Sequence, residues 1–435
     1  MLSSIQKNNC RAKAKKETDD SSVDALKKLH NEITSNSETI VISANEVGSS
    51  ITSFAHTNNF NTMAHKEPID TLALTHLQLK QFRCFKHTQL HFESNRVLIE
   101  GANGSGKTSL LEAMHYLCYL RSFRTHIPQE LVHAAAPSFF IKASFTNTTA
   151  GIPLTHEAQV GFQHKRRLVK IDDRTVSSYK ELLAHYRVLT LTEDDILLIT
   201  GGPEARRTFL DQALLLSDSA FIALLRSLRT CVAQRNALLQ DHRHTMDSYR
   251  VWTEQLWNLS IQIQQRRCIL LEELEKEVYT LGQGNTPWVL LSLSCRYLPK
   301  LTGNHPTFQA FMEANPELPT KEKLWGRTLF GAHLDDIALD FQERKSKIFA
   351  SRGQQKLIAL MLKIALIRLL NRQEGPKTIF LLDDFMTDFD DSRIEQLISL
   401  MGSLENQLIF TCPLRATPLA HQLSLQGAQR ISLTD

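Results

Sequence analysis

The chain contains only seven cysteines in 435 residues, and no two of them form a C-x-x-C pair. Scattered cysteines in an odd number argue against a disulfide framework or a C-x-x-C metal site, so we expect reduced thiols in the cytoplasm. Long apolar runs are also missing: none reaches the roughly 18 residues of a membrane-spanning helix. The longest run, 357–370, is interrupted by Lys363 and Arg368. The N-terminus lacks the apolar core of a secretory signal, and we expect no membrane partner.

An excess of one charge is equally absent. Lys and Arg number 50 against 46 Asp and Glu, which gives a formal net charge of +4. A charge this small does not by itself indicate a nucleic-acid partner. Hydrophobic residues make up 42% of the chain, which is enough to fill the cores of two or three domains.

The strongest motif present is a glycine-rich loop that matches G-x-x-x-x-G-K-[ST]. It reads Gly101-Ala102-Asn103-Gly104-Ser105-Gly106-Lys107-Thr108. Residues 96–100 before it have the pattern of a buried strand and 109–114 after it that of a helix, the context that a phosphate-binding loop requires. We expect Lys107 to reach the β- and γ-phosphates of ATP and the Thr108 hydroxyl to bind Mg²⁺. The alternative is a chance glycine turn before a helix.

A second motif stands near the other end of the chain. Residues 378–382 form an apolar stretch that ends in Asp383 and Asp384. A buried strand with an acid at its carboxyl end is the Walker B arrangement, in which Asp383 holds the metal through water. Asp384 can accept a proton from the attacking water or orient it, which makes Asp384 and Lys107 the predicted catalytic residues. The alternative is a plain Asp-Asp turn.

A third segment, Ser351-Arg352-Gly353-Gln354-Gln355, precedes the Walker B strand and opens a predicted helix at 354–370. Serine is a common helix N-cap for structural reasons alone. The pattern S-x-G-Q at this place resembles the signature of ATP-binding-cassette (ABC) ATPases, in which the signature of a second subunit meets the γ-phosphate. We therefore expect Ser351, Gly353 and Gln354 to contact ATP in an ATP-dependent homodimer.

Residues 1–71 differ from the rest of the chain. They are rich in Ser, Asn, Thr and Lys without sustained periodicity, and we expect them to be disordered. The basic run 11–16 is either a DNA-binding arm or a solvated tail. Met63 lies just before the folded pattern, so translation could begin there and residues 1–62 would then be an artefact of start-codon choice. A functional extension is the alternative.

The remaining pattern predicts an α/β fold, a P-loop ATPase head of the ABC type with a mixed sheet and an inserted helical arm or subdomain. Strands are expected at 77–82, 90–92, 96–100, 139–145, 158–162, 168–171, 187–191, 288–295, 337–341, 378–382 and 407–411. Apolar stripes predict helices across 203–282 with a polar break at 240–248. These helices fit either an inserted arm or, equally well, two core helices of one domain. Residues 304–320, with three prolines, are predicted to be a loop, and 392–404 a helix.

These elements suggest four segments. The extension at 1–71 is followed by an N-terminal lobe of the head at 72–200 that carries the phosphate loop. A helical insertion at 201–300 separates it from a C-terminal lobe at 301–435, which carries the signature and the Walker B strand.

Over residues 72–435 the sequence resembles the RecF family of bacterial recombination mediators, relatives of SMC heads. Segments 101–113 and 122–125 are similar to the family's phosphate loop and to a motif downstream of it. Residues 202–211 resemble the family pattern G-x-P-x-x-R-R-x-F-L-D, and 331–336 resemble G-P-H-R-D-D. The signature and Walker B segments follow in the family order.

Two departures stand out. Leu334 replaces the usual arginine of G-P-H-R-D-D, and 386–390 replaces F-S-E-L-D at the position that contacts the opposite subunit in such dimers. Asp390 is kept in that segment, while the altered residues bear on the strength of ATP-driven dimerisation. Thr411 stands at the switch position, where a transporter ATPase has a histidine.

The resemblance implies an ATP-dependent DNA-binding protein with weak, DNA-dependent ATPase activity that acts as a switch. Such a protein recognises single-strand/double-strand junctions at gaps, helps to load RecA with RecO and RecR, and serves replication restart and the SOS response. Phosphate contacts are expected from 165–167 and from Arg206 and Arg207. Each cluster can instead be a solvated face or an internal ion pair, and for Arg206 and Arg207 we favour a structural pairing.

Three other classes of protein share parts of this pattern. Another SMC-like head of a different DNA-processing system would carry a nuclease domain or a longer coiled coil, which the sequence does not suggest. A small-molecule kinase would place its acid and lid differently from the S-x-G-Q segment and the late Walker B strand. A transporter ATPase would need a switch histidine, and 407–413 contains none.

Overall fold

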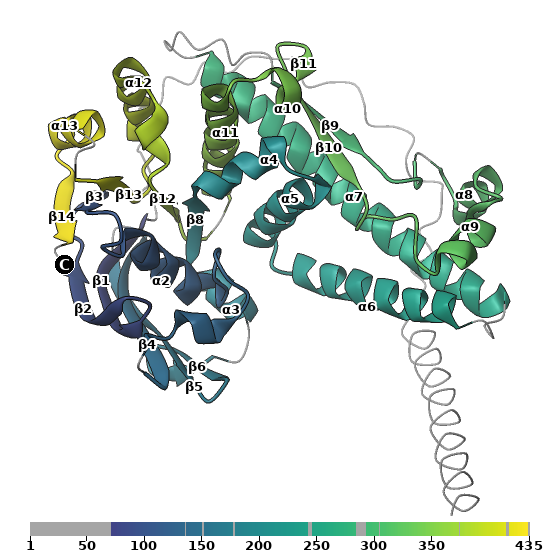
Figure 1. Cartoon of the computed structure of the whole chain (residues 1–435), viewed down its shortest axis with the longest axis horizontal. Helices are drawn as coiled ribbons and strands as arrows, with labels where there is room; N and C mark the ends of the chain where they lie inside the picture. Colours follow the sequence, from purple (N-terminus) through teal and green to yellow (C-terminus); the bar gives the residue numbers. More distant parts are fainter. Residues whose placement is uncertain are drawn as a thin grey trace, which may run out of the picture. The chain divides into compact units, whose positions relative to one another are not determined.

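The computed structural model in Figure 1 describes residues 71–433 apart from a few short gaps. The gaps are 135, 150–151, 177–178, 242–245, 284–292, 304, 374 and 415–416. The predicted disorder of 1–71 and the basic run 11–16 therefore lie outside the described residues, except for Thr71. In the described part of the chain, no helix combines the length and the apolar character needed to cross a membrane.

Five parallel strands form the sheet that carries the site, in the order β14-β3-β13-β12-β8 (Figure 1). Their bounds are β3 Arg96–Gly101, β8 Arg187–Leu191, β12 Thr378–Leu382, β13 Leu408–Pro413 and β14 Gln429–Leu433. Strands β8 and β12 are buried along their whole length, as expected of parallel strands covered on both faces. The first and last thirds of the described chain thus meet in one sheet.

Two hydrophobic cores lie on the two faces of this sheet, and alternate side chains of β12 enter each of them. Ile379 and Leu381 belong to one core, together with residues of helix α2 (Lys107–Tyr119). Phe380 and Leu382 belong to the other, together with helix α11 (Arg352–Asn371). The strand is therefore fixed by packing on both sides, and the acids at its end are held in place.

A separate antiparallel sheet has the order β2-β1-β4-β5-β6-β7 and packs with α2 around the first of these cores. Its strands are β1 Thr71–Phe82, β2 Phe85–His91, β4 Ser138–Thr149, β5 Ile152–Gln163, β6 Arg166–Ile171 and β7 Arg174–Thr175. Asp172 and Asp173 adopt positive φ angles of 47° and 64° in the turn between β6 and β7. The predicted α/β fold is confirmed, with parallel and antiparallel strands in different sheets.

Long helices follow β8. They are α5 (Pro203–Ser217), α6 (Phe221–Gln240) and α7 (Met246–Gly282), with the shorter α3 (Tyr179–His185) and α4 (Leu197–Thr200) before them. Helices α6 and α7 pack against each other and form the expected helical arm. Their apolar residues also belong to the core that contains α11, so the interpretation as core helices holds as well.

A small sheet of order β11-β10-β9 packs beside α7. Its strands are β9 Leu293–Leu298, β10 Asp336–Phe341 and β11 Arg344–Lys345. Of the strand expected at 288–295, residues 293–295 lie in β9, and 288–292 lie outside the described residues. The chain ends with α12 (Asp391–Gly402), β13, α13 (Thr417–Leu425) and β14.

The loop predicted for 304–320 is wrong, because this segment contains helix α8 (Phe308–Ala314) and most of α9 (Leu318–Trp325). Thr307 caps α8 by accepting a hydrogen bond from the Ala310 N–H at 3.1 Å. Pro319 stands in the first turn of α9, where a missing N–H costs no hydrogen bond. The prolines therefore begin a helix here and do not exclude one.

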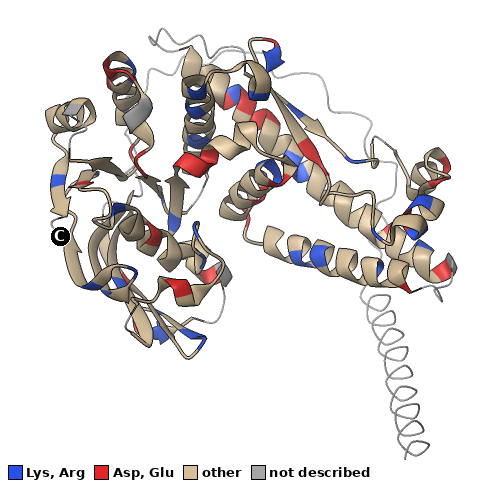
Figure 2. Cartoon of the chain, viewed as in Figure 1, with Lys and Arg blue, Asp and Glu red and all other residues tan. Residues whose placement is uncertain are grey.

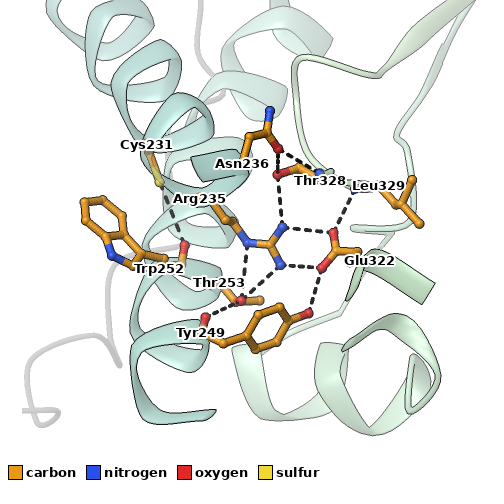
Figure 3. Close-up of polar contacts among 9 residues, drawn as sticks. All are labelled: Cys231, Arg235, Asn236, Tyr249, Trp252, Thr253, Glu322, Thr328 and Leu329. Carbon is orange, nitrogen blue, oxygen red and sulfur yellow. Dashed lines mark hydrogen bonds and ion pairs between the residues drawn. The ribbon is translucent and has the colours of Figure 1, made fainter. Parts of the chain in front are cut away.

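A buried ion pair fixes α9 to α6 (Figure 3). The side chains of Arg235 and Glu322 are both 0% exposed, and Arg235 Nη1 donates to Glu322 Oε1 at 2.9 Å. The Tyr249 hydroxyl donates to the carboxylate at 2.7 Å, and the guanidinium donates to the Thr328 hydroxyl at 3.0 Å. The Thr253 hydroxyl and the Leu329 N–H are further partners of the pair. A buried pair with this many partners is held in one geometry.

Candidate nucleotide site

The loop between β3 and α2 has the backbone of a phosphate-binding loop. Gly104 and Gly106 adopt φ angles of +92° and +96°, in the left-handed region that glycine enters without strain. A Cβ at Gly106 would lie 2.6 Å from Cys84 Sγ and 2.6 Å from Phe85 Cζ, so the β1–β2 turn packs closely on the loop. Helix α2 begins at Lys107, directly after the loop.

Lys107 is buried and folds back over its own loop. Its Nζ donates to the carbonyl oxygens of Gly101 and Ala102 at 3.1 and 3.2 Å. The Ser105 hydroxyl is buried and has no hydrogen-bond partner among the described residues. An ammonium, an unsatisfied hydroxyl and the N-terminus of a helix surround one small region, which fits an oxyanion such as phosphate. Ala102 and Asn103 are exposed at the rim.

The Walker B acid meets the loop although the two are 275 residues apart in sequence. Thr108 Oγ1 and Thr411 Oγ1 each donate to Asp383 Oδ1 at 3.0 Å. Burial raises the pKa of the Asp383 carboxyl, the Thr108 and Thr411 hydroxyls lower it, and Asp384 raises it further. A carboxylate and a hydroxyl are oxygen ligands of the kind that Mg²⁺ prefers, so Thr108 and Asp383 fit this ion.

Asp384, the second acid, faces the loop lysine. Its Oδ2 lies 3.8 Å from Lys107 Nζ, and its carboxylate side chain is 34% exposed. The backbone adopts a positive φ of 46°, and the Asp384 N–H donates to Thr411 Oγ1 at 2.8 Å. The two residues predicted to be catalytic are therefore neighbours, and Thr411 holds both acids in position.

The signature segment lies at the start of α11 and its polar groups are bonded to each other. Ser351 Oγ accepts from the Gln354 N–H at 3.3 Å, and the Ser351 N–H donates to Gln354 Oε1 at 2.8 Å. In the part of the chain that is described, no hydrogen bond joins Ser351, Gly353 or Gln354 to residues 101–108. Ser351 is exposed, so this helix start is open to a group from outside.

Some residues beside the site were not singled out from the sequence. Glu112 of α2 is fully buried and accepts from Arg83 Nε at 2.8 Å, with Arg124 Nη1 3.6 Å away. Arg124 also acts on Asp383, where its charge lowers the pKa against the stronger effect of burial. The 122–125 motif thus brings an arginine toward the site. A paired Arg and Glu so far apart in sequence leave no local pattern that would have revealed them.

The most specific family pattern, 202–211, has a structural role. Arg206 Nε and Nη2 donate to the Asp336 carboxylate at 2.7 and 3.1 Å, which confirms the predicted pairing. Arg207 donates to the Asp335 carbonyl, and Asp211 accepts two hydrogen bonds from Arg267 of α7. These bonds join α5 to α7 and to the 331–336 segment. Nothing in the structure explains Leu334.

Comparisons with known proteins agree with this geometry. Residues 73–425 match the family model described as RecF/RecN/SMC N terminal domain. A protein of a Synechococcus species named DNA replication and repair protein RecF is 31% identical over 366 residues, which cover 82% of this chain and 94% of that protein. Its namesake in Geotalea daltonii is 29% identical over 343 residues, covering 78% of this chain and 93% of the relative.

The fold is also that of a solved structure. The structure entitled "Structure of the recombination mediator protein RecF-ATP in RecFOR pathway" matches with a TM-score of 0.71 and 24% identity. The match covers 81% of this chain and 95% of that one. It establishes the ATPase-head architecture for the described sheets and helices.

Proposed function

This chain belongs to the RecF family, and we propose on that premise that it is an ATP-dependent DNA-binding protein of DNA replication and repair. The observation that carries the proposal is the hydrogen bond from Thr108 to Asp383 at 3.0 Å. It joins the phosphate loop to the Walker B strand, so that one triphosphate can engage both.

In this proposal the backbone of residues 101–108 surrounds the phosphates, and Lys107 exchanges its loop carbonyls for phosphate oxygens. Thr108 and Asp383 would hold Mg²⁺, which supplies charge neutralisation at the phosphates. Asp384 is placed to orient a water molecule or to accept its proton. Thr411 keeps the two acids apart and aligned through hydrogen bonds to both of them.

A second copy of the chain would complete the site. Helix α11 has 20 residues, and its N-cap, Ser351, is exposed. This exposed helix N-terminus is suited to contact the γ-phosphate of an ATP bound by another copy. ATP would thereby close a homodimer, and weak hydrolysis would open it again. In the altered segment 386–390, Asp390 caps α12 by accepting from the Arg393 N–H at 3.0 Å, so this acid also has a local role.

The proposed partner is DNA, and the proposed binding site on it is the single-strand/double-strand junction at a gap. With RecO and RecR the protein would promote loading of RecA, and so act in replication restart and the SOS response in the cytoplasm. The family membership and the names of the curated relatives support this role. The exposed basic residues 165–167 are consistent with contacts to phosphates.

The test is DNA retention on gapped, single-stranded and duplex substrates, each with and without ATP. We expect the gapped substrate to be retained best and only with ATP, and the Lys107→Ala variant to lose the ATP effect. Equal binding to all three substrates regardless of ATP would contradict the proposal.

A further inference from the structure

A cavity of about 280 Å³ lies between the end of α2, strand β6 and helices α5 and α6. Four arginines line it, and we call it the arginine cleft: Arg121, Arg167, Arg226 and Arg229. None of the residues of the nucleotide site, 101–108 and 383–384, lines it. The cleft is therefore distinct from the nucleotide site.

No carboxylate neutralises these arginines among the described residues. Arg167 donates to the carbonyl oxygen of Leu120 at 2.5 Å, and it also acts on the Tyr116 hydroxyl, whose pKa it lowers against the stronger effect of burial. In the described part of the chain none of the four arginines forms an ion pair with a carboxylate. Helix α6 carries arginines but no Asp or Glu along its length (Figure 2). Guanidinium groups that converge without counter-charges repel each other, so the cleft is suited to an anionic ligand.

The site extends beyond a single phosphate. A second cavity of about 350 Å³ shares Leu120, Arg121 and Arg167 with the first and continues along Ser122 and Thr125. The exposed Lys165 and Arg166 stand at the turn that leads into β6, beside Arg167. A continuous basic track of this kind matches a polyanion with repeated phosphates more closely than one compact anion.

The floor of the cleft is apolar. Its remaining lining residues are Tyr119, Leu120, Leu215, Ile222 and Leu225. Apolar and aromatic surface between arginines accommodates the sugar and base that separate successive phosphates of a nucleic acid. An inorganic ion would leave this surface exposed to water.

One helix connects the cleft to the nucleotide site. Helix α2 starts at Lys107, in the phosphate loop, and ends at Tyr119, which lines the cleft. Arg121 follows two residues later. A displacement of α2 when ATP binds would therefore change the spacing between Arg121 and the arginines of α6.

We propose that the arginine cleft binds the phosphodiester backbone of DNA. This inference rests on the proposed function and adds the place where DNA lies. Arg226 and Arg229 of α6 form one wall of the cleft, and Arg121 and Arg167 form the other. The charges of either wall can therefore be removed by substitution without altering the nucleotide site.

The experiment measures DNA affinity of the full chain in ATP across a series of salt concentrations. Arg226→Ala/Arg229→Ala should weaken binding about tenfold or more and reduce the slope of log affinity against log salt by about two. Arg121→Ala, on the opposite wall, should reduce the slope by about one. It tests the same cleft independently in case the double variant does not fold. The control is Arg250→Ala/Lys323→Ala, two exposed cations of α7 and α9.

The outcomes separate the possibilities. Cleft variants that bind within twofold of the wild type, or a control that loses as much affinity, would overturn the inference while leaving the proposed function intact. A wild-type chain that never retains DNA would defeat the proposed function itself. A free nucleotide is the other source of such phosphates: fluorescent ATP bound by Lys107→Ala and lost on Arg226→Ala/Arg229→Ala would assign the cleft to nucleotides and reject DNA.

Discussion

The ammonium group of Lys356 in α11 is paired with the carboxylate of Glu193, the second residue after strand β8. The Lys356 side chain is 0% exposed, and its Nζ also lies 5.2 Å from the ring centroid of Phe385, next to the Walker B acids. Two turns further, Lys363 Nζ donates to the Thr190 carbonyl and pairs with Asp195, each at 2.9 Å. Two buried lysines thus tie the signature helix to the strands that end at the nucleotide site.

The first prediction concerns this connection. Lys356→Met should leave the free energy of unfolding within about 1 kcal/mol, because the methionine avoids the cost of burying a charge and Glu193 can be solvated. ATP-dependent dimerisation should weaken about tenfold, since the start of α11 is then free to tilt against β8. Sedimentation velocity and thermal unfolding measure the two effects. Lys345→Met, at an exposed lysine of β11, is the control, and unchanged dimerisation of Lys356→Met would refute the coupling.

The second prediction separates binding of ATP from dimerisation. Lys107→Ala should abolish ATP binding, because the variant lacks the ammonium group that lies over the loop and that we propose contacts the β- and γ-phosphates. Ser351→Arg should bind ATP as a monomer and fail to dimerise, since the serine lies outside its own nucleotide site. Titration with fluorescent ATP and sedimentation distinguish the two variants. Normal ATP binding by Lys107→Ala would remove the phosphate-loop assignment.

The elements of the site were predictable because each has a local pattern. The strand before Gly101 and the strand before Asp383 are short apolar runs that end in chemistry-bearing residues, and both form as expected. The two motifs predicted that Thr108 and Asp383 would share one Mg²⁺ site, and the hydrogen bond that joins them at 3.0 Å was not predicted. The sequence predicts a strand before each residue, and the parallel sheet of the structure brings the carboxyl ends of these strands together.

Other features were not predicted from the sequence. The Glu193–Lys356 pair joins residues in different elements, and neither sequence neighbourhood contains its partner. Helices α8 and α9 were hidden by prolines that read as breakers but stand before or within a first turn. The basic residues of the arginine cleft were predicted only in part: 165–167 form a basic cluster in the sequence, whereas Arg226 and Arg229 are separate residues of a helix. Tertiary packing, which sequence periodicity does not encode, decides the ion pair and the cleft, whereas α8 and α9 carry local helix-start signals that the prolines outweighed in the prediction.

The third prediction follows from the pKa of Asp383, which burial raises above its ordinary value of 3.8. The carboxyl group of Asp383 therefore binds its proton more tightly in the folded apoprotein than in the unfolded chain. This difference stabilises the folded state at low pH. The stabilisation is lost as the pH rises from 3.8 through the higher pKa of the folded state. Asp383→Asn should therefore raise the melting temperature of the apoprotein at pH 7 by a few degrees, and abolish this part of the pH dependence.

The same variant should lose stabilisation by Mg²⁺ and ATP, since the carboxylate that would hold the ion is gone. Thermal scans from pH 4 to pH 8, with and without Mg²⁺ and ATP, measure both effects. Thr411→Val is the matched control, because it removes one hydrogen bond to each acid, at Asp383 Oδ1 and at the Asp384 N–H, and keeps both carboxylates. An Asp383→Asn protein that is stabilised by Mg²⁺ and ATP as strongly as the wild type would exclude Asp383 from the metal site.

The fourth prediction concerns the buried pair of Arg235 and Glu322 that fixes α9 to α6. Glu322→Gln removes one charge and leaves the guanidinium of Arg235 buried without its counter-ion, which costs about 3–5 kcal/mol of unfolding free energy. Replacing both residues, as Arg235→Met/Glu322→Met, removes both charges together and should restore most of that loss. Urea denaturation of the three proteins measures the differences. Since the pair lies in the arm, ATP binding by the folded fraction should be unchanged. A double variant as unstable as Glu322→Gln would show that hydrogen bonding to Tyr249, Thr253 and Thr328 contributes more to stability than the charges do.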